Sequence, residues 1–258
     1  MIEEPFRWVE AIQNRREYIE HQLAVGSPIA CLSCPAGVLL LTVSRERQKI
    51  FEIYDRIAMG GIGHPGDIER LRMAAIEVTS AEGFGRSAQD VSLRRLASYS
   101  LSPLLKAAFE QIYGPPYLSR MLFVELGRRD EPDLFVRLDY DGAFHTNGGS
   151  FSKAVEPFAV ISGKTHSSDM MEKFLRGKDF KKASLDQAFA IALDAWMVGH
   201  IALSDDAEIL PSEEALAAHR EEQLGFGSVE AALLDREART NITYRSLTPS
   251  EVGALVPV

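Results

Sequence analysis

Residues 29 to 63 read IACLSCPAGVLLLTVSRERQKIFEIYDRIAMGGIG, and this stretch decides the fold class. It contains the short apolar runs IACLSC, VLLLTV, KIFEIYD and RIAMGGIG, with turn or charged residues between them. Runs of this kind bounded by turn residues are typical of strands, and the turn Pro35-Ala36-Gly37 makes the first two a hairpin. The stretch therefore predicts a meander of strands rather than strands that alternate with helices.

An amphipathic helix is predicted before this meander. Between Phe6 and Val25 apolar residues recur at steps of three, four and seven, while charged residues occupy other positions. We assign the helix to residues 9–25 and expect Gly26 and Pro28 to end it. The pattern is compatible with a helix that covers its own core and with one that packs on another chain.

Helices and hairpin strands continue to alternate in groups along the rest of the chain. A long helix is predicted from the turn HPGD, and a second from Asp90 as its N-cap, with a kink at Pro103. The remaining elements are the strands RMLFVEL, DLFVRLDYDG and PFAVISG, helices after Ser184 and Ser212, and the closing strands SVEAALLD and NITYRSL. This order predicts an α+β fold with antiparallel sheets and helices in separate layers.

The composition is that of a soluble globular protein. Of the 258 residues 46% are hydrophobic, and the formal net charge is −9 with a pI near 5.3. The acidic average argues against a nucleic-acid partner, and the absence of a long apolar run argues against a membrane partner. The N-terminus lacks the pattern of a signal peptide, so the expected location is cytoplasmic.

The sequence indicates neither a metal site nor a cofactor. The only cysteines, Cys31 and Cys34, form CLSC within a predicted strand, and no second Cys or Cys/His pair completes a zinc site. The six histidines are scattered along the chain. We interpret both cysteines as small apolar thiols of the core.

The letters GIGHPG, residues 61–66, fit a dinucleotide-binding pattern, G-x-G-x-x-G. They follow a meander instead of the first strand of a βαβ unit, and Pro65 lacks the N–H that a phosphate cradle needs. The glycines are better explained by close packing and a tight turn into the helix. We accordingly rank a nucleotide-dependent enzyme last among the candidate functions.

Several other polar residues are interpreted as structural. Asp139 and Asp141 in LDYDG are predicted to form a turn in which Gly142 supplies a positive φ. His64 is predicted to be a solvated turn residue. The stretch KTHSSDMMEKFLRGKDFKK, residues 164–182, is predicted to be a polar loop and a short helix rather than a docking surface.

A family resemblance rests on longer blocks of the chain. They are RREYIEHQLAVGSPIACLSCPAGVLLLTV with QKIFEIYDRIAMGGIG, then LDYDGAF, and finally SVEAALLDREARTNITYRSLTPSEVGALV. These blocks resemble the α subunit of the proteasome core particle, in its bacterial, actinobacterial-type branch. The resemblance covers nearly the whole chain, with departures between His145 and Lys182 and between Asp205 and Leu224.

The resemblance implies a four-layer αββα sandwich of the N-terminal-nucleophile hydrolase type, with an extra N-terminal helix. It implies one domain over residues 1–258, made of a gate segment 1–8, the helix 9–25, and a sandwich with a short C-terminal tail over 27–258. Function still has to be argued from the site.

Catalytic relatives of this fold expose an N-terminal nucleophile after a glycine, with a lysine and an acid nearby. Here Ser27 follows Gly26 and Lys49 falls at the lysine's place, but Val43 replaces the acid. Pro28 also constrains Ser27 and removes a backbone N–H beside it. We therefore expect no catalytic residues, and keep as the alternative a self-processing hydrolase that uses Ser27 after cleavage at Gly26.

What the resemblance implies is a subunit of a heptameric ring of copies of itself, stacked on proteasome β subunits. The ring would admit unfolded protein substrates and dock a ring-shaped AAA+ ATPase activator. Activator-tail docking is expected at Lys49, Gly26, Gly63 and His64, unless Lys49 simply forms an ion pair with Glu46 or Glu52. The gate is expected to consist of Met1, Ile2, Glu3, Glu4, Pro5, Phe6, Arg7 and Trp8.

Overall fold

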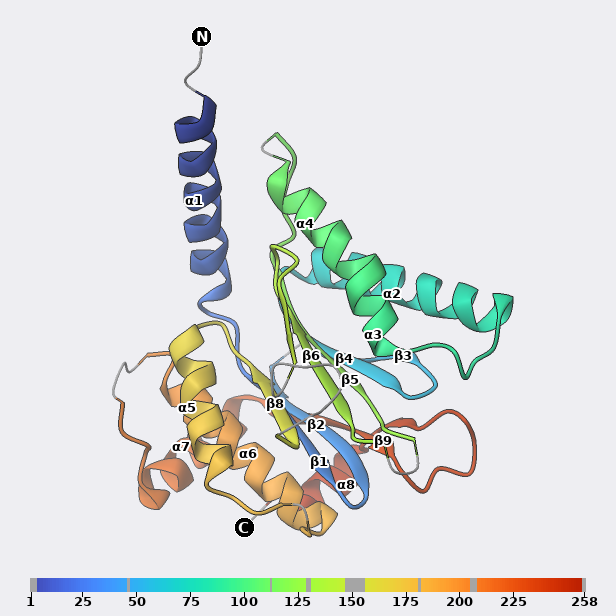
Figure 1. The fold of residues 1–258 in the computed structure, drawn as a ribbon. Coiled ribbons are helices and arrows are strands. Elements are labelled where there is room, and N and C mark those ends of the chain that lie inside the picture. Colours follow the sequence, from blue (N-terminus) through green and yellow to red (C-terminus); the bar gives the residue numbers. More distant parts are fainter. Residues whose placement is uncertain are drawn as a thin grey trace.

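The fold is a sandwich of two antiparallel sheets with helices on both outer faces (Figure 1). It is described by a computed structural model for residues 4–45, 47–111, 113–128, 131–146, 156–180, 182–204 and 208–256, with side chains from Arg7 onward. The predicted α+β class and the αββα order of layers are confirmed.

One sheet contains the first hairpin and the closing strands. Its order is β10-β9-β2-β1-β8, and each neighbouring pair is antiparallel. The bounds are β1 Ile29–Cys34, β2 Gly37–Ser44, β8 Phe158–Ile161, β9 Ser228–Asp235 and β10 Tyr244–Ser246. The long pairing of β2 with β9 brings the C-terminal part of the chain against the first hairpin.

The other sheet contains the remaining strands in the order β3-β4-β5-β6-β7. The bounds are β3 Ile50–Tyr54, β4 Ile57–Gly63, β5 Ser119–Glu125, β6 Leu134–Leu138 and β7 Phe144–Thr146. Side chains from both sheets fill the space between them, among them Ile29, Leu40, Leu122 and Phe135, and all four are almost completely buried. This apolar layer fixes the register of the two sheets because a slip by one residue would turn it outward.

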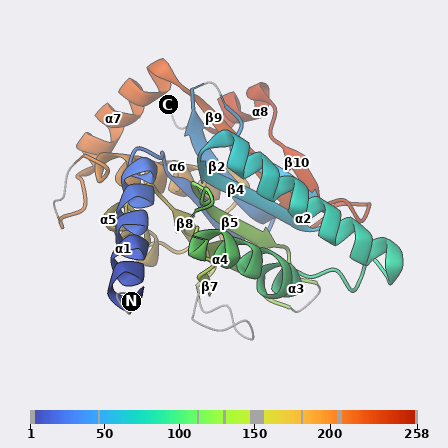
Figure 2. The same cartoon turned by 90° about the horizontal axis from the view of Figure 1, so that it is seen from above.

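Helices cover the two outer faces in separate groups. One group is α2 Pro65–Gly85, α3 Leu93–Arg95, the π-helical segment η1 Leu96–Leu101 and α4 Ser102–Glu110, which pack on the second sheet. The other is α5 Thr165–Arg176, α6 Leu185–Ile201, α7 Glu213–Phe226 and α8 Pro249–Leu255, on the first sheet. Figure 2, seen from above, shows α1 at one side of these layers, away from the far end of α2.

The first helix, α1, runs from Glu4 to Leu23, so the predicted bounds of 9–25 were wrong at both ends. Proline is tolerated in the first turn of a helix, which allows the helix to include Pro5. At the other end the Gly26 N–H donates to the Leu23 carbonyl (2.7 Å), which turns the chain toward β1. Only part of α1 packs on the sandwich, through Ile19 and Leu23, and its N-terminal half stands clear in Figure 1.

The second predicted helix is broken into three consecutive segments. Its N-cap is Ser92 rather than Asp90, and the Ser92 side chain accepts a hydrogen bond from the Arg95 N–H. The π-helical segment η1 ends directly before α4, whose first turn contains Pro103. Because proline lacks an N–H and crowds the preceding turn, a change in helical hydrogen bonding before it is physically reasonable.

Two short elements were not predicted, and the strands DLFVRLDYDG and NITYRSL were predicted too long, since β6 covers only Leu134–Leu138. Strand β7 and helix α8 were not predicted, and NITYRSL forms only the three-residue strand β10. The N-terminus of α8 has a capping box, in which Thr248 and Glu251 bond each other's backbone N–H groups. The sequence Thr-Pro-Ser-Glu, residues 248–251, is a local signal for the start of this helix.

Candidate functional site

A pocket of about 790 Å³ opens where the end of α1, the segment between β2 and β3, the β4–α2 turn and α6 meet. Three of the four predicted docking residues, Lys49, Gly26 and Gly63, line it. His64 is exposed at the N-cap of α2 and is not among the lining residues, although its neighbour Pro65 is. The structure thus brings most of the predicted docking set to one place.

Lys49 is half-buried and directly precedes β3, although the run KIFEIYD predicts a strand that includes it. Its position is fixed by Glu230 of β9, whose carboxylate accepts the backbone N–H groups of Lys49 (3.0 Å) and Ile50 (2.8 Å). Burial lowers the pKa of Lys49, and the charge of Glu230 partly offsets this effect. Glu230 was not predicted, because its partners lie far away in the sequence.

The ammonium group of Lys49 contacts the hydroxyl group of Ser27. Within the described residues no ion pair joins Lys49 to Glu52, and Glu46 lies outside them. Val43, at the place of the expected acid, is 6% exposed and lines the same pocket. The pocket therefore contains the serine and the lysine of the alternative hypothesis, with an apolar side chain where the acid would stand.

Gly26 and Gly63 are positions where a side chain would not fit. A Cβ atom on Gly26 would lie 2.0 Å from the Ile62 side chain. Gly63 has a φ of 125°, and its Cβ atom would lie 2.1 Å from the Leu118 carbonyl oxygen. Packing at Gly26 and backbone conformation at Gly63 already require glycine. The two glycines are therefore not by themselves evidence that a ligand approaches the backbone closely.

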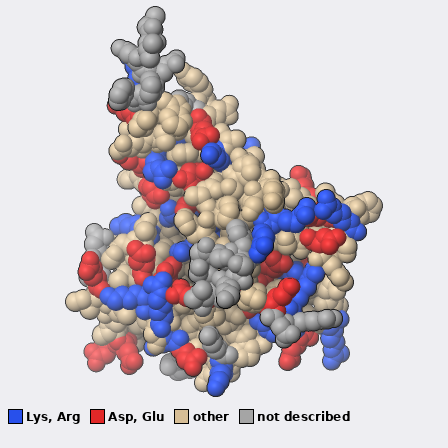
Figure 3. All heavy atoms as spheres, in the orientation of Figure 1, with Lys and Arg blue, Asp and Glu red and all other residues tan. Residues whose placement is uncertain are grey.

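The pocket lining is basic although the chain is acidic. Arg45, Arg47 and Lys49 line it, against one acidic lining residue, Glu69, which forms an ion pair with Arg72 (2.7 Å). Elsewhere the two signs are interspersed, as Figure 3 shows for one face of the molecule. A local excess of positive charge with a half-buried ammonium group favours an anionic ligand.

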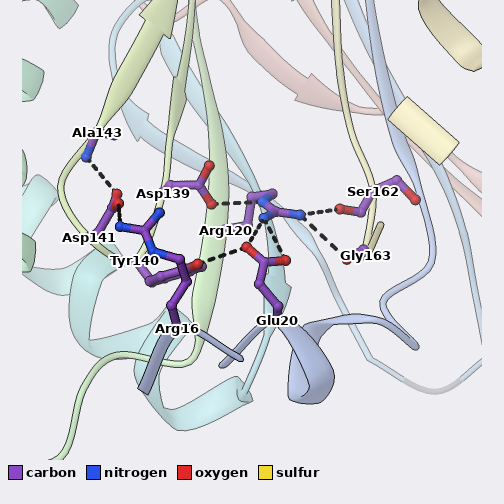
Figure 4. Close-up of polar contacts among 9 residues, drawn as sticks. All are labelled: Arg16, Glu20, Arg120, Asp139, Tyr140, Asp141, Ala143, Ser162 and Gly163. Atoms are coloured by element: carbon purple, nitrogen blue, oxygen red, sulfur yellow. Dashed lines mark hydrogen bonds and ion pairs between the residues drawn. The ribbon is translucent and has the colours of Figure 1, made fainter. Parts of the chain in front are cut away.

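Arg120 of β5 is the centre of a polar network that the sequence analysis missed (Figure 4). Its guanidinium group is bonded to Asp139 (2.7 Å), to Glu20 of α1 (3.0 Å) and to the Ser162 carbonyl (2.9 Å), and the residue is only 8% exposed. Tyr140 also donates to Glu20 (2.8 Å). This network connects α1 to both sheets. Its contact on α1, Glu20, lies one helical turn before Leu23, which lines the pocket.

Asp139 is thus more than the predicted turn former, because its carboxylate pairs with Arg120. Burial alone would lower the pKa of Arg120, but Asp139 and Glu20 outweigh it and hold that pKa above its ordinary value. Asp141 does stabilise the turn, accepting the Ala143 N–H (3.0 Å), and Gly142 has the predicted positive φ of 80°.

Arg15 provides a second attachment of α1. Its guanidinium group donates to the Phe109 carbonyl (2.8 Å) and the Gln111 carbonyl (2.9 Å) at the C-terminal end of α4. Cations there interact favourably with the unpaired carbonyl groups and the helix dipole. Together with Glu20, Arg15 makes the segment ahead of Ser27 part of the folded structure.

The predicted gate residues are only partly described. Met1, Ile2 and Glu3 lie outside the described residues, and Glu4, Pro5 and Phe6 are described as helix without their side chains. Arg7 and Trp8 follow in the same helix, and Trp8 is 46% exposed. The predicted boundary between a gate segment 1–8 and a helix that starts at residue 9 is therefore wrong, because the helix already includes the residues from Glu4 onward.

The cysteines lie in the core of β1, as interpreted from the sequence. Both are free and buried, and burial raises the pKa of each thiol. Within the described ranges no group of three or more His, Cys, Asp or Glu side chains is placed to hold a metal ion. The described helices include none with the length and apolar character to cross a bilayer.

Two facing antiparallel sheets between helical layers, with a leading helix and a basic pocket at its end, define an α+β sandwich protein with an N-terminal helical extension. No family model matches the chain. It is 28% identical to the proteasome subunit alpha of Kineococcus radiotolerans over 96% of this chain and 94% of the relative. It is 28% identical to those of Saccharopolyspora erythraea and Mycobacterium marinum, over 96% of this chain and 85% and 84% of the relatives.

These comparisons confirm the resemblance seen in the sequence. The chain is related to proteasome α subunits of the actinobacterial type, and the relationship implies the N-terminal-nucleophile hydrolase type of sandwich. The similarity to proteins of that name supports the assignment of this chain as a proteasome α subunit.

Proposed function

We propose that this chain is a non-catalytic α-ring subunit of a bacterial 20S proteasome core particle. Copies of the chain form a heptameric ring that stacks on proteasome β subunits in the cytoplasm. The ring controls the entry of unfolded protein substrates into the proteolytic chamber and docks a ring-shaped AAA+ ATPase activator.

The observation that carries this proposal is the bonding of α1 into the fold. Arg15 caps α4, Glu20 pairs with Arg120, and Ile19 and Leu23 are buried, so the residues ahead of Ser27 are held as structure. A self-processing hydrolase would have to release this segment to expose a new N-terminus. A subunit that uses its N-terminal helix for assembly must instead retain this segment.

One observation favours the alternative, a self-processing hydrolase with Ser27 as its nucleophile. The Lys49 ammonium contacts the Ser27 hydroxyl, and burial lowers the pKa of Lys49, which brings it closer to that of a general base. Pro28 and Val43 oppose this function, as the sequence indicated. Mass spectrometry separates the two functions, because cleavage at Gly26 would remove the segment before Ser27.

Co-expression with a proteasome β subunit, followed by negative-stain imaging and intact-mass measurement, tests the proposal. We expect stacked heptameric rings that contain the chain at its full 28.6 kDa. A chain that stays monomeric with the β subunit present would refute the assembly role. A chain that begins at Ser27 would establish the alternative.

Lys49→Ala should leave ring assembly and basal peptide hydrolysis intact but weaken binding of the activator's C-terminal tail at least tenfold. The reason is that loss of a charge-assisted hydrogen bond typically costs about 1.5 to 3 kcal/mol. Calorimetry on assembled particles with a peptide of the activator tail measures the affinity. Lys182→Ala, which removes an exposed lysine outside the pocket lining, is the matched control; equal affinities in both variants would remove Lys49 from the docking site.

Deletion of Met1 to Trp8 should open the ring and raise hydrolysis of short peptides and unfolded proteins by the assembled particle. These residues lie ahead of the part of α1 that contacts the sandwich through Ile19 and Leu23, so the fold should tolerate their loss. The hydrolysis rate is compared with that of particles built from the intact chain. Normal assembly with an unchanged rate would show that the segment is not the gate.

A further inference from the structure

Two histidines from different helices are joined at the wall of the basic pocket. The Nδ1 atom of His200, in the last turn of α6, lies 2.9 Å from the Nε2 atom of His219 on α7. The His200 ring also stacks on Trp196, with ring centres 4.6 Å apart and planes 17° from parallel. His200 and Trp196 both line the pocket that contains Lys49.

Trp196 lines this pocket with a side chain that is almost completely buried. The residue is 1% exposed, and its indole N–H has no hydrogen-bond partner among the described residues. A buried donor without a partner is costly, so an acceptor brought within reach of it would be favoured. The same pocket holds the ammonium group of Lys49 and the hydroxyl group of Ser27.

The charged groups around the histidine pair come from two sides. Burial is the largest cause that lowers the pKa of His200 to about 4, followed by His219 and then by Arg45 and Lys49. Both of these cations belong to the segment between β2 and β3. Burial lowers the pKa of His219. Glu222, which lies 3.7 Å from His219, partly offsets this effect. The nearby Asp194 and Arg220 pair with each other across α6 and α7.

A proton can be accommodated by the pair without breaking the contact between its rings. When both rings are neutral, one ring N–H donates to the unprotonated nitrogen of the other. One added proton leaves an imidazolium that donates to a neutral imidazole, and only a second proton would remove the acceptor. The neighbouring cations Arg45 and Lys49 oppose the first proton, and an anion in the pocket would offset their charge.

We propose that a carboxylate entering this pocket binds together with one proton, which the His200–His219 pair takes up, so that the pocket binds carboxylate-ended ligands more tightly in mild acid. This inference rests on the proposed docking of a carboxylate-ended segment at Lys49. By linkage, a ligand that favours protonation is itself bound more tightly where the proton is available.

The size of the effect follows from the two states of the pair. If the bound carboxylate restores an ordinary histidine pKa of about 6.5, affinity should rise about tenfold between pH 7.5 and pH 5.5. The free protein adds little to this change, because the pKa of His200 without a ligand is about 4 and the ring is neutral at both pH values. The ligand's own terminal carboxylate, with a pKa of about 3.5, stays ionised throughout.

Calorimetric titration of the full chain with the tripeptide N-acetyl-Gly-Phe-Ala tests the inference. The phenylalanine suits the apolar side of the pocket, formed by Phe51, Ile62 and Trp196. Titrations at pH 7.5 and 5.5, in two buffers of different ionisation enthalpy, give the affinity and the number of protons taken up. The same peptide with an amidated C-terminus shows how much of the binding depends on the carboxylate.

We expect about tenfold tighter binding at pH 5.5 with net proton uptake, and loss of this pH dependence in His200→Gln and His219→Gln. The control His145→Gln, which removes an exposed histidine of β7 outside the pocket lining, should retain it. Thermal unfolding of each variant establishes that it is folded.

The possible contrary results separate the inference from the proposed function. Carboxylate-dependent binding that is equal at both pH values, or a pH dependence that survives in both glutamine variants, would overturn the inference and leave the docking pocket intact. Absence of carboxylate-dependent binding at either pH would overturn both the inference and the docking role of Lys49.

Discussion

Replacement of Arg120 by methionine should destabilise the chain by about 3 to 5 kcal/mol, because it removes one partner of a buried charge network. Arg120 is 8% exposed and is bonded to Glu20 and Asp139. Methionine replaces the aliphatic part of the arginine side chain but offers no donors, so two carboxylates and the Ser162 carbonyl would lose their bonds to the guanidinium group. Chemical denaturation of the full chain measures the loss of unfolding free energy.

The matched control is Arg16→Met, which removes a neighbouring ion pair in the same region of Figure 4. The Arg16 guanidinium lies 3.0 Å from Asp141, but its side chain is 53% exposed. An exposed pair contributes about 0 to 1 kcal/mol, so the control should change stability little. Similar losses of unfolding free energy in the two variants would show that burial of the Arg120 network does not increase its contribution to stability.

The position of Arg120 also connects the stability of α1 to the pocket. Arg120 contacts the Gly163 carbonyl (3.4 Å), and the Gly163 N–H donates to the carbonyl of Gly26 (3.0 Å), which lines the pocket. Glu20 lies one turn before Leu23, another lining residue. The network therefore holds the wall of the docking pocket as well as the helix.

Local patterns were sufficient for most of the strands. The bounds of β1 and β9 equal the apolar runs IACLSC and SVEAALLD, because both strands are largely buried and end at turn residues. The start of α1 was predicted too late because a proline near the N-terminus was not considered as part of a first turn. Breaks such as η1 depend on tertiary packing that no window of sequence contains.

The candidate site was predictable only where the resemblance supplied it. Gly26, Lys49 and Gly63 meet in one pocket although they lie on different elements, and the residue types alone did not indicate this. Arg120 occurs in an apolar run and has partners 100 residues earlier and 19 residues later, so no periodicity reveals its role. The histidine pair joins two helices, and its residues are likewise scattered in the sequence.

The exposed side of α1 indicates how the proposed ring is held together. Ile19 and Leu23 are buried against the sandwich, whereas Tyr18 is 53% exposed and Val9 58% exposed on the same helix. Tyr99 of η1 and Leu104 of α4 are also exposed, and Figure 3 shows largely uncharged surface over α4. Exposed aromatic and aliphatic side chains on neighbouring helices suit contact with a second copy of the chain.

Tyr18→Lys should therefore abolish ring assembly without lowering the stability of the single chain. The substitution leaves Ile19, Arg15 and Glu20 in place, so intramolecular packing of α1 is preserved, but it puts a charge where an apolar contact with a neighbour is expected. Analytical ultracentrifugation measures the assembly state, and thermal unfolding of the monomer measures stability. Ile242→Lys is the matched control, because Ile242 is 56% exposed in a loop away from α1. Intact rings in the Tyr18 variant would show that this side of α1 faces solvent and that the helix serves only to cover its own chain, whereas monomers in that variant alone would assign α1 to the contact between subunits.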